Sequence, residues 1–295
     1  MAASITHLVV GERVLNLYYS NSPQEVQSAF LAGCALVDVH AFNDIDRRHT
    51  HFVGTVEEDG ENAYLQSCAN FLQNLDSLLR LPWKMLQPEE HSFVVGYLCH
   101  LAVDECWKKL GLELFQKLGI HSWADFPMPG DVSLTTYDFL GSKQLLDPCV
   151  LDTILEDVVI PDVFLHMPMT IFVRQWDVIR DYVFAGGTPE AHFHMLELAG
   201  RSKSEIEETQ QRYQAYWERS IEFVENIGGV EPFLQNGFER SIQVLPQLLA
   251  RAQNLYEANV AQQSVHRTAG GLRVLSLIQA RNLVPFRELV LSSRR

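Results

Sequence analysis

Several features that define whole classes of protein are absent from this 295-residue sequence. It contains no run of about 18 consecutive apolar residues, so we expect no integral membrane association. The start, MAASITHLVVGERVLNLYY, lacks a basic segment before its apolar residues, and Glu12 and Arg13 interrupt them. That pattern argues against a secretory signal peptide. Internal repeats and low-complexity tracts are also missing, which leaves an ordinary globular chain.

Basic residues are scarce relative to acidic ones. Lysine and arginine total 23 against 37 aspartates and glutamates, which gives a formal net charge of −14. Proteins that bind nucleic acid normally neutralise phosphates with lysine and arginine, and no basic stripe with interleaved aromatic residues is present. An acidic total still leaves room for a local basic pocket. We therefore expect a small-molecule or lipid-like substrate and no nucleic-acid partner; the oligomeric state is not indicated.

Cysteines are few, odd in number and without CxxC spacing, so a disulfide framework is not expected. Several lie in apolar helical runs, where a cysteine behaves as a small hydrophobic residue. Reduced thiols are typical of cytoplasmic proteins, and we predict that location. The five are Cys34, Cys68, Cys99, Cys106 and Cys149.

What the sequence does contain is a succession of helix patterns. Hydrophobic residues make up 47% of the chain and charged residues 20%, a globular composition. Prolines next to capping residues mark helix starts, at Ser22–Pro23, Pro88, Asp147–Pro148 and Thr188–Pro189. Two long helical patterns cover 202–229 and 237–260, the second with a kink or break before Pro246. The predicted fold class is all-α, a multi-helix bundle.

A change in composition divides the chain. Residues 122–148 are rich in proline, glycine and serine, and most histidines precede them. We expect residues 1–121 to form a metal-binding helical half and residues 149–295 a supporting or pocket-forming helical half. Because both halves are helical, one continuous bundle and two domains both fit this pattern.

One helix carries an unusual polar pair. The segment FVVGYLCHLAVDECW, residues 93–107, is apolar nearly all the way round, so we expect it to be buried at the centre of the first half. Gly96 would permit close backbone approach. His100 and Asp104 lie one turn apart on the same face, and burying a carboxylate costs several kcal/mol unless it is paired. A bound metal ion would neutralise Asp104; a hydrogen-bonded His–Asp core pair is the alternative.

Four short motifs occur in the order THLVVGERVL, FLAGCALVD, RRHTHF and GYLCHLAVDECW, within about residues 4–110. In this order and spacing they resemble the zinc-dependent phospholipase C family, whose all-α fold is shared with fungal single-strand nucleases. The resemblance implies that His7, Asp38, His51, His100 and Asp104 converge on metal. In the family pattern, the last four hold one ion, and the residue matching Asp104 bridges towards a second ion at the residue matching His7.

The sequence also departs from that family pattern. Val37 replaces the usual proline before the aspartate, no N-terminal tryptophan ligand is present, and no His-x-x-x-Glu pair follows. His192 and His194 are two residues apart and so face different sides of a helix. We therefore expect one or two ions rather than three, with zinc as the metal and iron or manganese as alternatives.

Three functions fit these observations. The first is a metal-dependent hydrolase acting on a phosphoester, in which metal-bound water attacks and Arg47 or Arg48 contacts the phosphate. The second is a metal-dependent lyase, cyclase or tailoring enzyme whose second half forms an apolar substrate cavity. The third is a non-catalytic helical protein with a structural metal. We expect the first.

Overall fold

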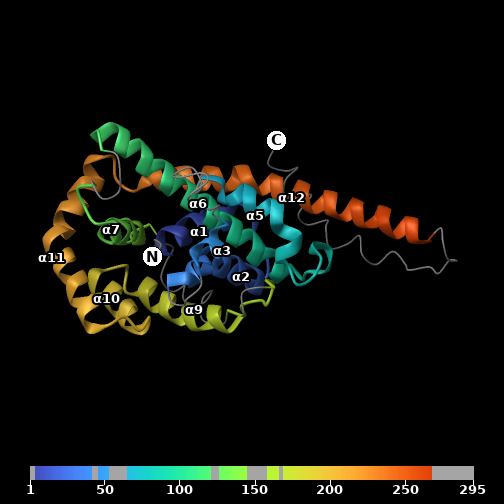
Figure 1. The fold of residues 1–295 in the computed structure, drawn as a ribbon, viewed down its shortest axis with the longest axis horizontal. Helices are drawn as coiled ribbons and strands as arrows, with labels where there is room; N and C mark the ends of the chain where they lie inside the picture. The colour runs from blue at the N-terminus through green and yellow to red at the C-terminus, as the bar shows by residue number, and fades with distance from the viewer. Residues whose placement is uncertain are drawn as a thin grey trace. The chain divides into compact units, whose positions relative to one another are not determined.

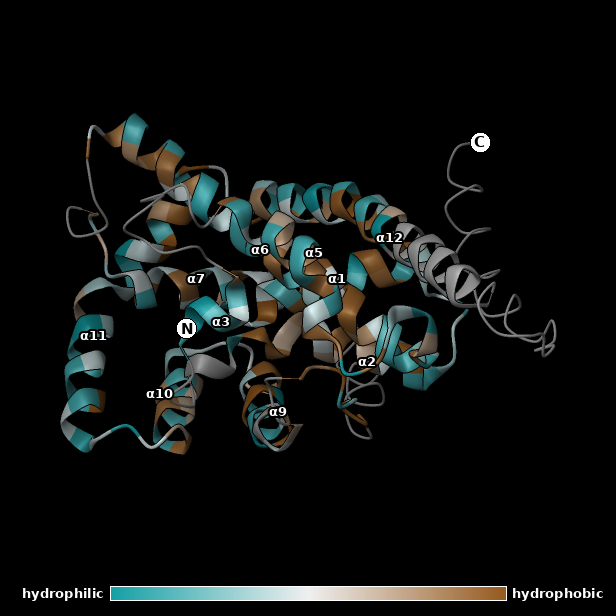
Figure 2. Cartoon of the chain, turned by 45° about the vertical axis from the view of Figure 1, so that its right-hand side comes forward, coloured by the Kyte–Doolittle hydropathy of each residue, from teal (hydrophilic) through white to brown (hydrophobic). Residues whose placement is uncertain are grey.

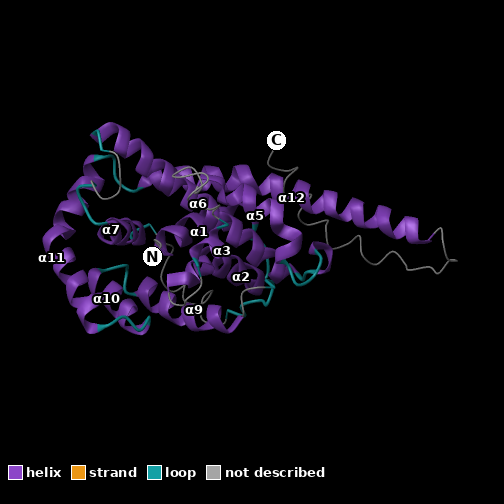
Figure 3. Ribbon diagram, viewed as in Figure 1, coloured by secondary structure: helices purple, strands orange, loops and turns teal. Residues whose placement is uncertain are grey.

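The apolar periodicity of the sequence produces helices throughout the computed structural model, which describes residues 4–41, 46–52, 65–120, 126–144, 158–165 and 169–267. Within these ranges there is no strand, only an isolated bridge between Leu79 and Phe164 (Figure 3). The predicted all-α multi-helix fold is confirmed. No helix in these ranges has both the length and the hydropathy needed to cross a membrane.

The elements follow one another along the chain as labelled in Figure 1. Their bounds are α1 (Ser4–Tyr18), α2 (Gln24–Ala35), η1 (Leu36–Ala41), α3 (Arg47–His51), α5 (Ser67–Leu78), η3 (Trp83–Met85), α6 (Pro88–Leu118), α7 (Gly130–Ser142), α9 (Met169–Phe184), α10 (Pro189–Leu198), α11 (Lys203–Asn226) and α12 (Glu231–Arg267). Residues 1–249 form one compact unit and residues 250–295 a second. The first unit contains helices from both of the predicted halves.

The predicted helix starts are borne out in part. Pro88 opens α6 behind a capping box made by Gln87 and Glu90, and the Thr188 side chain accepts a hydrogen bond from the Ala191 backbone at the start of α10. The prediction of Ser22 as a cap is wrong, because Pro23 itself is extended (ψ 152°) and α2 begins only at Gln24. Helix α12 continues through Pro246, so a break at this proline, one of the two predicted alternatives, does not occur. The start predicted at residues 147–148 lies outside the described ranges.

Helix α6 is central to the first unit, as its apolar circumference predicts. It packs against α1, α2, α5 and η1, and nearly every residue from Ser92 to Val103 is buried. In Figure 2 the outlying helix α11 is mainly hydrophilic, whereas hydrophobic colour gathers among the helices around α6. The burial of this helix, expected from its sequence, is therefore confirmed.

Helices α2 and α6 cross backbone against backbone at two glycines. A Cβ atom on Gly96 would lie 2.0 Å from the Phe30 carbonyl oxygen, and one on Gly33 would lie 2.2 Å from the Phe93 carbonyl oxygen. No real side chain tolerates such distances, so both positions require glycine. The crossing brings the end of α2 directly alongside the turn of α6 that holds His100.

Helix α7 was not anticipated from the sequence. It lies inside the segment whose proline, glycine and serine content suggested a separator, yet it packs against α1 and α11. The hydroxyls of Thr136 and of Ser220 on α11 are hydrogen-bonded to each other, and the Asp138 carboxylate accepts bonds from the backbone and hydroxyl of Thr6 on α1, each 2.8 Å long. Its small hydroxylated residues pack through hydrogen bonds rather than through an apolar stripe, which conceals the helix from hydrophobic periodicity.

Asp138 gives the fold a predicted pH dependence. Burial raises the pKa of its carboxyl to about 6, although the Thr6 hydrogen bonds oppose this shift. Between pH values of about 4 and 6 the unfolded chain therefore releases a proton that the folded protein keeps, and the free energy of unfolding falls as pH rises, by up to roughly 3 kcal/mol. Asp138→Asn keeps an acceptor for Thr6 and should remove this dependence.

Urea unfolding at pH 4.5 and 6.5 measures the effect as the difference between Asp138→Asn and the unchanged protein. Asp177→Asn, on an exposed carboxylate of α9, serves as the matched control and should leave the pH slope as it is. An equal slope in all three proteins would show that Asp138 ionises alike in the folded and unfolded states.

Candidate metal centre

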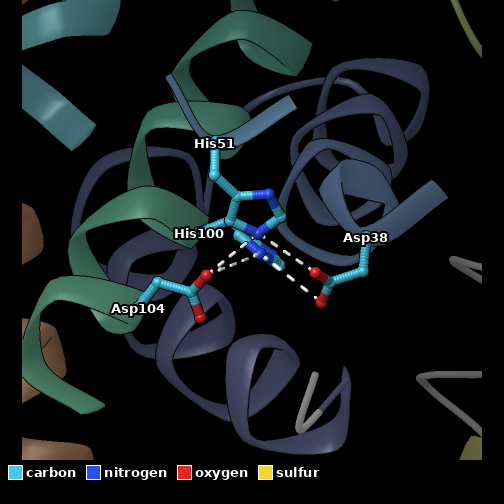
Figure 4. Close-up of side chains that lie close together, drawn as sticks. All are labelled: Asp38, His51, His100 and Asp104. Atoms are coloured by element: carbon cyan, nitrogen blue, oxygen red, sulfur yellow. Dashed lines mark ion pairs between the residues drawn. The ribbon is translucent and has the colours of Figure 1, made fainter. Parts of the chain in front are cut away.

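Four of the predicted ligands meet inside the first unit. Asp38 comes from η1, His51 from the end of α3, and His100 and Asp104 from α6, and one ligand atom of each lies within 4.8 Å of the others. Figure 4 shows the four side chains pointing toward one common point. The side chains of Asp38, His51 and His100 are 4% exposed or less, and that of Asp104 is 14% exposed. Residues distant in sequence are thus brought together in a nearly enclosed group.

His51 lies between the two carboxylates. Its Nε2 is 3.0 Å from Asp38 Oδ1 and 3.0 Å from Asp104 Oδ2. The Nε2 of His100 is farther from the same groups, 3.6 Å from Asp38 Oδ2 and 3.8 Å from Asp104 Oδ2. These separations are too long for good hydrogen bonds from His100, and its Nε2 has no hydrogen-bond partner in the described part of the chain. A buried ring nitrogen in that state fits a metal ligand better than a satisfied core histidine.

His7, the fifth predicted ligand, lies beside this group rather than within it. Its Nε2 is 3.3 Å from Asp104 Oδ1, and its ring stacks on that of His100 with centroids 3.8 Å apart. The two oxygens of Asp104 therefore face different neighbours, Oδ1 toward His7 and Oδ2 toward His51. That a second ion binds at His7, as the family resemblance implies, stays a prediction.

The backbone orients His100. Its Nδ1 is 2.7 Å from the Cys34 carbonyl oxygen, which can only accept, so Nδ1 carries the proton and the Nε2 lone pair faces the carboxylates. Metal-binding histidines commonly donate their second nitrogen in this way, which fixes both tautomer and ring orientation. The contact exists because Gly33 and Gly96 let the α2 and α6 backbones touch.

A threonine orients His51 in the same manner. The Thr50 hydroxyl donates to the Arg47 carbonyl oxygen over 3.2 Å, so it accepts from His51 Nδ1, which is 2.7 Å away. The Tyr97 hydroxyl on α6 donates to the Thr50 carbonyl oxygen over 2.5 Å and fixes α3 against the core. Thr50 and Tyr97 therefore hold the Nε2 of His51 toward the centre of the group.

Electrostatics keep both carboxylates ionised. Burial raises the pKa values of Asp38 and Asp104, but charge from His100 and hydrogen bonds from His51 lower them by more than burial raises them. Both pKa values therefore lie below the ordinary range. For His51, the lowering by burial is outweighed by the two carboxylates, and its pKa is raised. Burial, followed by the nearby charge of His7, lowers the pKa of His100 to about 3. His100 is thus neutral at physiological pH, the state that binds metal.

The two candidate arginines have different surroundings. Arg47 Nη2 is 3.0 Å from Asp104 Oδ2, whereas Arg48 pairs with Asp46, the residue that caps α3. The Asp104 carboxylate is therefore paired with two histidines and with Arg47. The Arg48 side chain is 55% exposed.

Sequence reasoning did not single out Lys108. It stands in the run ECWKKL, which resembles an exposed charged turn, yet its residue is only 8% exposed. The signal was its position, since Lys108 follows Asp104 by four residues and so lies on the same face of α6. Farther along the chain, His192 is buried and His194 is exposed, which confirms that they face different sides.

The donors fit a divalent transition metal. Two imidazole nitrogens and two carboxylate oxygens are ordinary ligands of zinc, and also of iron and manganese. The two carboxylates also supply the negative charge that such an ion requires. Comparison with family models, curated proteins and solved structures finds no match for this chain. The group Asp38, His51, His100 and Asp104 could hold a metal ion, and the phospholipase C resemblance stays a prediction from short motifs.

Proposed function

We propose that this protein is a metal-dependent hydrolase, with zinc as its metal, that cleaves a phosphoester of a small or lipid-like molecule. The proposal is carried by one observation, the enclosed group of two aspartates and two histidines whose ligand atoms lie within 4.8 Å of one another. Asp38, His51, His100 and Asp104 would hold the ion, with His7 beside them. The ion would polarise a phosphoryl oxygen and make water nucleophilic near neutral pH.

The protein's own residues contribute orientation and charge. The Cys34 carbonyl and the Thr50 hydroxyl each accept a hydrogen bond from the Nδ1 of one histidine, so both rings would present Nε2 to the ion. Asp104, the most exposed of the four, marks the side from which a substrate would approach, and Arg47 lies on that side. Its guanidinium would bind phosphate oxygens.

The charge of the chain favours a small substrate. A net charge of −14 repels a polyanion, whose binding normally rests on many lysine and arginine contacts. A single phosphate needs only the ion and a few local cations. This argument supports a phosphorylated small molecule or lipid headgroup over nucleic acid.

A structural metal site is the second candidate. Its support is the burial of Asp38, His51 and His100, because a four-ligand site closed to solvent holds metal without offering a position to substrate. Such a site would stabilise the fold and give no hydrolysis.

The test compares zinc-loaded protein on bis(p-nitrophenyl) phosphate, p-nitrophenyl phosphate and single-stranded DNA. We expect hydrolysis of a nitrophenyl ester and its loss, by more than about 100-fold, in His51→Ala and His100→Ala, since even groups behind the ligands affect activity 10–100-fold. His194→Ala, on an exposed histidine, is the matched control. Cleavage of DNA alone would contradict the substrate, and a zinc-replete protein without any hydrolysis would favour the structural site.

A further inference from the structure

We infer that Arg47 and Lys108 form an anion-binding subsite beside the metal centre, suited to the dianionic group of a phosphate monoester. The inference rests on the proposed function, since it assigns the substrate class at the same site. It adds a residue, Lys108, and a preference for monoesters over diesters.

Both cations are placed near one ligand, Asp104. Lys108 follows Asp104 by one helical turn on α6, which places both side chains on the same face. Arg47 opens α3, and its Nη2 is 3.0 Å from Asp104 Oδ2. Arg47 is 43% exposed, so its guanidinium lies at the accessible edge of the metal group.

The two cations also interact electrostatically. Burial lowers the pKa of the Lys108 ammonium, and the Arg47 charge lowers it further. Two like charges held together and partly removed from water destabilise one another, and a bound anion would relieve both costs. The arrangement therefore favours binding of an anion.

The neighbouring residues show that this arrangement is specific. Lys109, the next residue on α6, has a side chain that is 72% exposed and pairs with Glu113. Arg48, the next residue on α3, is 55% exposed and pairs with Asp46. Each member of the proposed subsite thus has an adjacent residue of the same charge that is more exposed and pairs with another acid.

The chemistry of the pair matches a terminal phosphate. Arginine offers a planar fork for two oxygens, and lysine a compact charge for a third. A monoester carries about −1.5 to −2 charge near pH 7 and three peripheral oxygens, whereas a diester carries one charge and two such oxygens. A cation held by Asp104 would compete with Arg47 for this carboxylate, which would leave the guanidinium available to phosphate.

The experiment measures binding of inorganic phosphate to the zinc-loaded, full-length protein by isothermal titration calorimetry. We expect Arg47→Gln and Lys108→Gln each to weaken binding roughly tenfold or more, the effect of losing one charged hydrogen bond. Arg48→Gln and Lys109→Gln, the matched controls, should leave it unchanged. Lys108→Arg keeps the charge and should retain most of the affinity. A loss of affinity in Lys108→Gln alone is then caused by the missing charge and not by misfolding. Zinc content, measured on each variant, should stay at the wild-type ratio.

The outcomes separate this inference from the proposed function. If Lys108→Gln binds phosphate as tightly as the unchanged protein, or if Lys109→Gln weakens binding equally, the subsite is wrong even when the protein hydrolyses esters. If binding depends on Lys108 and Arg47 but no ester is cleaved, the subsite stands and the hydrolase proposal fails. Faster hydrolysis of the diester than of the monoester would overturn the preference.

Discussion

Asp104→Asn is expected to abolish the rise in melting temperature that zinc gives to the unchanged protein. Asp104 supplies one of the two carboxylates of the group, and its Oδ2 lies within 4 Å of both histidine Nε2 atoms. An amide in its place carries no charge and is a weak ligand. A cation that binds only the folded state stabilises it by about 2.7 kcal/mol at 100 times its dissociation constant. Thermal unfolding with and without zinc, after chelator treatment, measures the difference.

The zinc-dependent shift is the informative quantity, because Asp104→Asn also removes the partner of Arg47 and His51 in the metal-free protein. Breaking that group lowers stability whether or not metal binds. Asp177→Asn makes the same chemical change on an exposed carboxylate and should keep the full shift. A group of hydrogen-bonded core residues without metal predicts no shift in any of these proteins. Retention of the full shift in Asp104→Asn would place the zinc elsewhere.

Gly96→Ala is expected to cost more than about 3 kcal/mol of folding free energy, beyond the usual range for one added methyl group. The new Cβ would lie 2.0 Å from the Phe30 carbonyl oxygen and 3.0 Å from the Cys34 nitrogen. These contacts are with backbone, so no side-chain rotation relieves them and α2 must move away from α6. Urea unfolding followed by circular dichroism measures the loss.

The same substitution should weaken zinc binding, since moving α2 separates the Cys34 carbonyl from His100 Nδ1. Gly130→Ala is the matched control: a Cβ there meets nothing within 4 Å, and Gly130 is the first residue of α7. We expect it to be neutral or slightly stabilising, because alanine favours the helix. If Gly96→Ala unfolds at the same urea concentration as the unchanged protein, the helices accommodate the new methyl group without loss of folding free energy, and the prediction is wrong.

Sequence patterns predicted those features that depend on neighbouring residues alone. The apolar circumference of residues 93–107 predicted a buried helix, and the proline with its capping box predicted where that helix starts. The His100–Asp104 spacing indicated a shared face. Helix α7 escaped detection because threonine, serine and aspartate make up more of its buried face than apolar residues do, which weakens its hydrophobic periodicity.

Contacts between residues that are distant in the sequence could be predicted only in part. The family resemblance predicted five ligands, and the structure brings four of them together, Asp38, His51, His100 and Asp104. No pattern along the chain could show that Arg47 contacts a residue 57 positions away, or that its charge acts on Lys108. Such contacts depend on where two helices cross, and that crossing is set by the packing of whole helices.

The crossing of α2 and α6 at Gly33 and Gly96 should make the residence time of a bound ion depend on how often this part of the core opens. The backbone turn that holds His100 is the one on which these two helices meet, so amides 96–100 and the ligand group should open in a single cooperative event. Hydrogen exchange at those amides and release of the ion should then slow together when zinc is present. On this basis the rate of ion release would be set by separation of α2 from α6, and not by fluctuations of the surface loops.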